Sequence, residues 1–164
     1  MARDATARLY DVDDEALIYK RLNLTAKYDQ ATITFRAKKD KRIDLQKLHE
    51  SVWATRLSGG TGSGVICLKI TASGDVAVAD SETVLNVGGE DRQFVLVDDV
   101  PAKPTDFEKS VLSSLRESLA RGERVVSVSG YVDGWGGKWP VVLGKPPVKR
   151  PKLMVTSFET AKSP

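Results

Sequence analysis

Apolar and polar residues alternate along most of residues 65–158, which is the pattern of β-strands with one buried face. Glycine interrupts two of the long alternating runs, at Gly74 and Gly130. A glycine inside a strand usually marks a bulge or a sharp bend. The pattern therefore predicts two bent strands among five runs: 65–71 continuing into 75–78, then 83–87, 93–97, 124–132 and 153–158.

One segment between the third and fourth runs has a helical period instead. Its apolar face consists of Phe107, Val111, Leu112, Leu115 and Leu119. Thr105 and Glu108 have the spacing of a capping box, in which each side chain satisfies the other residue's free amide. Gly122 lies where a left-handed residue ends a helix. We therefore expect a helix that begins near Pro104 and ends at Gly122.

The first part of the chain has a weaker pattern. Residues 22–28 and 31–36 alternate around a short polar break and predict a hairpin. A short strand over 5–12, a helical turn or two over 13–21 and an amphipathic helix over 44–57 are also predicted. The glycine-rich stretch 58–64 then separates two expected domains, 1–64 and 65–164.

Composition narrows the chemistry that such a fold could carry. With 41% hydrophobic and 29% charged residues, the 164-residue chain has enough apolar material for a core. It has one cysteine, Cys67, and one histidine, His49, so it has no cysteine pair for a disulfide or redox centre and too few ligands for a zinc site. We expect no catalytic residues, no metal ligands and no cofactor, which describes a non-enzymatic protein.

The N-terminus enters charged sequence directly, and no run approaches the roughly 20 apolar residues of a membrane-spanning helix. The chain as written is therefore expected to have no membrane span and to be cytoplasmic. A signal peptide encoded upstream would instead make it periplasmic or secreted.

An aromatic, glycine-rich segment after the fourth run is the best candidate binding site. Trp135 and Trp139 flank Lys138, and indole rings can stack on bases for roughly 1–3 kcal/mol per base. Three further residues support this candidate site: Tyr131, Lys149 and Arg150. Two interpretations remain open, since tryptophans in small barrels either form a ligand platform or cover the core.

The order bulged strand, strand, strand, helix, strand, strand resembles the OB fold, a small Greek-key barrel whose surface and loops commonly bind oligonucleotides or oligosaccharides. The resemblance covers residues 65–158 and rests on this order and on the two glycine-bearing strands. It implies a five-stranded OB-like β-barrel with one helix between strands three and four. It also places the tryptophan loop between strands four and five.

Residues 24–35 and 43–48 resemble the second hairpin and second helix of the heavy-metal-associated domain, the ferredoxin-like module of copper chaperones. The resemblance implies an incomplete ferredoxin-like N-terminal half. That family holds its metal with a Cys-x-x-Cys segment, whereas the corresponding residues 10–15 contain no cysteine. No metal ligand is therefore transferred to this chain.

Together these features predict an α+β protein with a ferredoxin-like first half and an OB-like second half. The expected function is that of a non-enzymatic binding or accessory protein, related to heavy-metal-associated domains but without their cysteines. The alternative is an oligonucleotide-binding protein that uses the aromatic loop. Single-stranded nucleic acid or a protein is the candidate partner.

Overall fold

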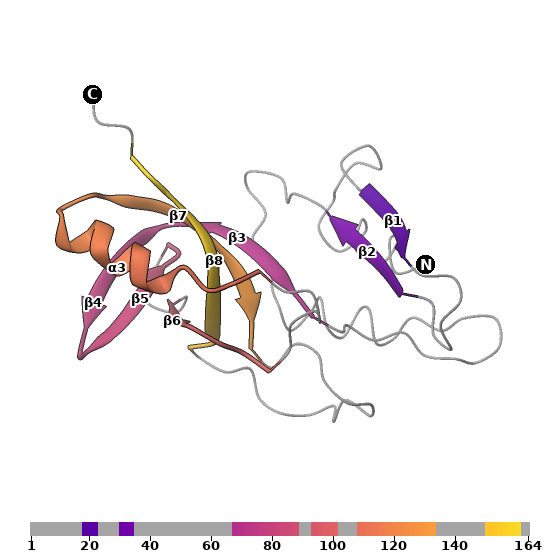
Figure 1. Cartoon of the computed structure of the whole chain (residues 1–164), viewed down its shortest axis with the longest axis horizontal. Helices are drawn as coiled ribbons and strands as arrows, with labels where there is room; N and C mark the ends of the chain where they lie inside the picture. Colours follow the sequence, from indigo (N-terminus) through magenta and orange to yellow (C-terminus); the bar gives the residue numbers. More distant parts are fainter. Residues whose placement is uncertain are drawn as a thin grey trace. The chain divides into compact units, whose positions relative to one another are not determined.

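The computed structural model describes residues 18–22, 30–34, 67–88, 93–101, 108–133 and 150–161. The chain divides into two compact units, Met1–Val65 and Ile66–Pro164. In the first unit, β1 (Ile18–Leu22) pairs antiparallel with β2 (Gln30–Thr34), as Figure 1 shows. A hairpin is therefore present in this half.

The first strand of the hairpin begins earlier than predicted, and residues 23–28 of the predicted strand lie outside the described residues. The run 22–28 shares only Leu22 with β1, and residues 18–21 are strand where a helical turn was predicted, so that prediction was wrong. Residues 18–22 form a strand because they pair with β2, which their own pattern does not predict. The predicted strand 5–12 and helix 44–57 lie outside the described residues.

The second unit contains one six-stranded mixed sheet and one helix (Figure 1). Its elements are β3 (Lys69–Ser73), β4 (Asp75–Ala79), β5 (Glu82–Asn86), β6 (Gln93–Val97), α3 (Leu112–Ala120), β7 (Val125–Val132) and β8 (Lys152–Thr160). The strand order is β3-β7-β8-β6-β5-β4, and only the pair β6 and β8 is parallel. The described part of this unit is thus α+β, with the predicted element order.

Gly74 separates β3 from β4, which are consecutive in the chain but stand at opposite ends of the strand order. β3 pairs with β7, whereas β4 pairs with β5. The Gly74 N–H donates to the Val126 carbonyl at 3.2 Å, and Arg124 on the β7 side forms an ion pair with Asp75 at 3.0 Å. A Cβ on Gly74 would lie 2.1 Å from the Asn86 carbonyl oxygen, so only glycine fits this bend.

Gly130 has the same role in β7. The register against β8 shifts between Ser129 and Gly130, and a Cβ there would lie 2.0 Å from the Met154 carbonyl oxygen. The irregularities predicted at both glycines are confirmed.

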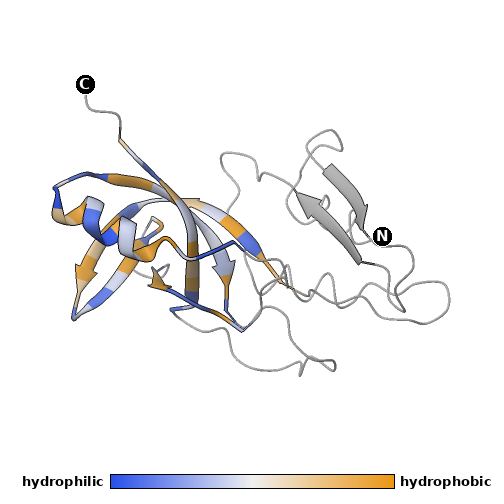
Figure 2. Cartoon of the chain, viewed as in Figure 1, coloured by the Kyte–Doolittle hydropathy of each residue, from blue (hydrophilic) through white to orange (hydrophobic). Residues whose placement is uncertain are grey.

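Aliphatic side chains fill the interior of this unit. Figure 2 shows apolar and polar positions interspersed along its strands. The largest fully buried residues include Leu85, Leu112, Leu115, Leu153, Val128 and Val132. Helix α3 contacts β7 and β8, so its buried leucines help to close the core.

The helix begins later than predicted. The Val111 N–H donates to the Val155 carbonyl at 3.0 Å, a bond to β8 that holds the chain at the helix start, and the first helical residue is Leu112. Ser110 accepts a hydrogen bond from the Leu112 N–H at 3.2 Å. Glu108 lies outside the helix and pairs with Lys69, so the predicted capping box was wrong.

The end of the helix is as predicted. Gly122 has a φ of +80° and its N–H donates to the Leu119 carbonyl at 2.9 Å, while the Glu123 N–H donates to the Ser118 carbonyl at 3.0 Å. This pair of bonds is a Schellman motif. In the described residues, no helix has both the length and the apolar character needed to cross a membrane.

We predict that Gly130→Ala lowers the free energy of unfolding by roughly 2–4 kcal/mol, because the new methyl group meets backbone rather than a movable side chain. Gly88→Ala is the matched control. Gly88, unlike Gly130, has a positive φ, +64°, but its Cβ would meet nothing within 4 Å, so a loss of only about 1 kcal/mol is expected. Equal losses in urea unfolding would contradict the steric explanation.

The turn between β4 and β5 supplies a stabilising variant. Asp80 and Ser81 both have positive φ, 49° and 68°, as in the type I′ turn that favours Asp-Gly. Ser81→Gly should raise the free energy of unfolding by about 0.5–1 kcal/mol, since glycine relieves the left-handed conformation at a smaller entropic cost. Thermal unfolding of Ser81→Gly, measured in parallel with Ser81→Ala, tests this prediction. A stability of Ser81→Gly below that of wild type would refute it.

Candidate functional site at the base of the β7–β8 loop

The structure describes two of the six predicted binding residues, Tyr131 and Arg150. The other four, Trp135, Lys138, Trp139 and Lys149, belong to residues 134–149 and lie outside the described residues. The two ends of this segment, and their surroundings, therefore define the site.

Backbone hydrogen bonds hold the two ends of the segment together. The Asp133 N–H donates to the Lys152 carbonyl at 2.9 Å, which joins the end of β7 to the start of β8. The Pro151 carbonyl accepts from the Val95 N–H of β6 at 3.0 Å. The segment 134–149 thus leaves from a fixed base on the sheet.

Arg150 connects this base to β5. Its guanidinium group donates to a carboxylate oxygen of Glu82 at 3.2 Å, and both side chains are about half exposed. Since Glu82 directly follows the β4–β5 turn, the loop base lies next to that turn.

Tyr131 is part of the packing beneath the loop. Its side chain lies in a cluster with Val100 and Met154, and the residue is only 8% exposed. The ammonium group of Lys69 lies 5.6 Å from the centre of the ring. Burial raises the pKa of the Tyr131 phenol. The ring therefore supports the base of the loop and has little free surface for stacking on a ligand.

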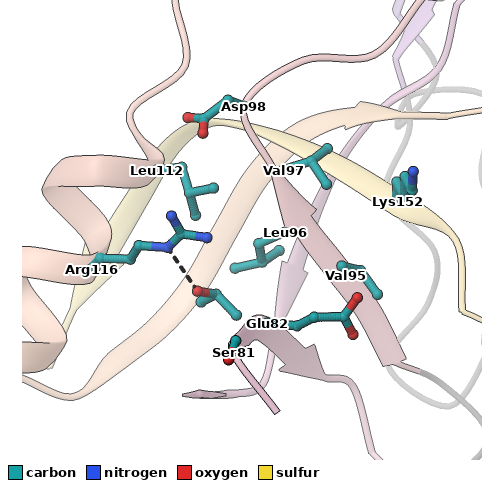
Figure 3. Close-up of a pocket in the computed structure, with 10 residues that line it drawn as sticks. Ser81, Glu82, Val95, Leu96, Val97, Asp98, Leu112, Arg116 and Lys152 are labelled. Atoms are coloured by element: carbon teal, nitrogen blue, oxygen red, sulfur yellow. Dashed lines mark hydrogen bonds between the residues drawn. The ribbon is translucent and has the colours of Figure 1, made fainter. Parts of the chain in front are cut away.

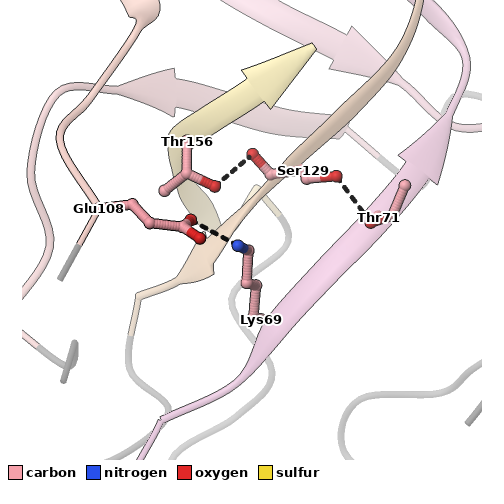
Figure 4. A network of polar contacts seen from close by, with 5 residues as sticks. All are labelled: Lys69, Thr71, Glu108, Ser129 and Thr156. Carbon is pink, nitrogen blue, oxygen red and sulfur yellow. Dashed lines mark hydrogen bonds and ion pairs between the residues drawn. The ribbon is translucent and has the colours of Figure 1, made fainter. Parts of the chain in front are cut away.

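A polar network extends over β3, β7 and β8 beside Tyr131 (Figure 4). Lys69 forms an ion pair with Glu108, and hydrogen bonds from Lys69 and Thr156 hold the pKa of Glu108 below its ordinary value. Thr71 and Ser129 share a hydrogen bond of 2.7 Å between their hydroxyl groups. The Thr156 hydroxyl also donates to the Ser129 carbonyl at 3.3 Å. Sequence reasoning missed this network because Lys69 and Glu108 are 39 residues apart.

A cleft of about 310 Å³ lies between α3 and the strands β5, β6 and β8 (Figure 3). Leu96 and Leu112 give it apolar walls. Its polar and charged lining includes Ser81, Glu82, Asp98, Arg116 and Lys152. Glu82 belongs both to this cleft and to the ion pair at the loop base, so the two features are adjacent.

Arg116 is fixed within the cleft by a hydrogen bond. Its Nε–H donates to the Thr83 hydroxyl oxygen at 3.0 Å, and Thr83 is 2% exposed (Figure 3). Arg116 stands one turn after Leu112 on α3, which places both on the same side of the helix. The sequence held one signal for this arginine: it follows Leu112 by four residues, so a charged residue shares the apolar face of the helix.

The described residues contain no group of three histidine, cysteine, aspartate or glutamate side chains that could hold a metal ion. Burial raises the pKa of the half-buried Cys67 thiol, which lowers its thiolate fraction. His49 and residues 10–15 lie outside the described residues.

Comparisons with protein-family models, with curated proteins and with solved structures find no match for this chain.

The lowered pKa of Glu108 predicts a pH-dependent contribution to stability. The ion pair contributes fully above the ordinary carboxyl pKa of the unfolded chain, and the contribution is lost as the pH falls through the lower pKa of the folded state. Because Lys69 and Glu108 are partly exposed, we expect Glu108→Gln to cost at most about 1 kcal/mol at neutral pH.

Urea unfolding over a pH series measures this contribution. The difference in free energy of unfolding between wild type and Glu108→Gln should shrink as the solution is acidified. In the double variant Lys69→Gln with Glu108→Gln, the loss of stability should be smaller than the sum of the two single losses. A difference that stays constant down to strongly acidic pH would show that the charge of Glu108 is not the cause.

Proposed function

We propose that the second unit is an OB-like barrel that binds single-stranded nucleic acid through the β7–β8 loop and has no catalytic activity of its own. The observation that carries this proposal is the strand order β3-β7-β8-β6-β5-β4, with β3 and β4 joined only by Gly74. If β3 and β4 count as one bent strand, the order closes on itself. The helix then lies between the third and fourth strands and the parallel pair is the third and fifth, as in an OB barrel.

The contacts across Gly74 support closure. The hydrogen bond from Gly74 to Val126 and the ion pair between Arg124 and Asp75 both join the start of β7 to the bend. One strand can thus hold β7 along its first half and β5 along its second half.

Fold alone does not assign a ligand, so the ligand class rests on the loop. The segment 134–149 carries Trp135 and Trp139, and Lys138 lies between them. Indole faces stack on bases of any sequence, and lysine attracts the phosphate backbone. The hydrogen-bonded base described above would hold such a platform at a fixed point of the barrel surface.

The composition of the core favours a platform over a plug. Within the described residues the fully buried positions of the second unit are held mainly by leucine and valine. These side chains supply the apolar interior that a covering tryptophan would otherwise help to provide.

The relation of the first unit to heavy-metal-associated domains stays a prediction.

Tryptophan fluorescence tests the proposal. A short single-stranded oligonucleotide should quench the emission of the full chain at low salt, and the affinity should fall as salt rises because phosphate contacts release counterions. Trp135→Ala combined with Trp139→Ala should weaken binding by at least about tenfold, as expected for the loss of two stacking rings.

Trp53→Phe is the matched control, since it removes the remaining tryptophan and should leave the affinity unchanged. Binding is followed in parallel by anisotropy of a labelled strand, and thermal unfolding confirms that each variant is folded. Absence of binding at low salt, or equal affinity for wild type and the double variant, would refute the proposed function.

A further inference from the structure

The cleft between α3 and β5 contains an arginine that is held in place but has no acidic partner among the described residues. The Nε–H of Arg116 is used by Thr83, whose hydroxyl is buried. The ion pairs that join described residues are Lys69–Glu108, Arg121–Glu123, Arg124–Asp75 and Arg150–Glu82. No described acidic residue pairs with the terminal amino groups of Arg116, and a guanidinium group binds a ligand with two acceptor oxygens in a bidentate manner.

Both carboxylates of the cleft lining already have a partner among the described residues. Lys152 also belongs to the lining, and Figure 3 draws it on the other side of β6 from Arg116. Glu82 already has Arg150 as its counter-charge. Asp98 accepts a hydrogen bond of 2.9 Å from Ser110 ahead of α3.

The size of the cleft limits what could enter. A volume of about 310 Å³ is at the lower end of the range of small-molecule sites. The cleft suits one small charged group with an adjoining apolar or sugar moiety rather than a length of polymer. Its position is also informative, because Glu82 links it to Arg150 at the base of the β7–β8 loop.

We infer that this cleft binds a terminal phosphate group of the nucleic-acid strand, with Arg116 as the bidentate ligand. This inference rests on the proposed function. A terminal phosphate monoester carries about −1.5 to −2 charges at neutral pH and has three acceptor oxygens. An internal phosphodiester carries only one charge, so the strand end should be preferred.

Three strands of one sequence test the inference: one with a 5′-phosphate, one with a 3′-phosphate and one with hydroxyl groups at both ends. Anisotropy is measured on the full chain in chloride buffer. Either the 5′-phosphorylated or the 3′-phosphorylated strand should bind about tenfold more tightly than the hydroxyl strand, which is the gain in affinity expected from a charge-assisted bidentate contact. Arg116→Gln should reduce this preference to less than about twofold.

Arg121→Gln is the matched control, because Arg121 lies just after the same helix, is exposed and pairs with Glu123 rather than facing the cleft. It should keep the preference. Lys152→Gln is a second control, because it removes a cation of the same lining but leaves the Arg116–Thr83 hydrogen bond in place, and it should keep most of the preference.

Inorganic phosphate separates failure of this inference from failure of the proposed function. It should raise the melting temperature of wild type, but not of Arg116→Gln, relative to chloride at equal ionic strength. Equal affinities for all three strands would overturn the inference while leaving strand binding intact. An Arg116-dependent phosphate shift in a protein that binds no strand would refute the proposed function and retain the cleft as a phosphate site.

Discussion

Gly74 is the point at which one stretch of chain stops pairing with β7 and starts pairing with β5. This change of partner requires the backbone to pass so close to the Asn86 carbonyl that no side chain fits. Gly130 allows the same close approach between β7 and β8. The pairings of β3 with β7, of β4 with β5 and of β7 with β8 depend on these two close approaches.

These pairings also determine where polar groups meet. Lys69 on β3 reaches Glu108 ahead of α3 and covers Tyr131 on β7, although these residues are far apart in the chain. Arg150, two residues before β8, reaches Glu82 on β5, and α3 brings Arg116 to Thr83 on the same strand. The base of the β7–β8 loop and the neighbouring cleft thus share strand β5.

The proposed function and the further inference use different parts of the second unit. Stacking on the aromatic loop is tolerant of sequence and supplies affinity along a strand. A fixed arginine in a small cleft recognises one charged group by geometry. Together they describe a protein that would hold a strand and sense its end.

The sequence by itself determined the element types of the second unit and the positions of its bends. Alternation marked the strands, Gly122 marked the helix end, and the two strand glycines marked the irregular pairings. These features are local, since each follows from the period or the backbone freedom of neighbouring residues.

The tertiary structure decided what long-range pairing controls. It made residues 18–21 part of a strand where a helical turn was predicted, because these residues pair with β2. It began α3 at Leu112, because the Val111 N–H is bound by β8 and Glu108 is bound by Lys69. It also brought Arg116 to Thr83, a contact between residues 33 apart that no local pattern encodes.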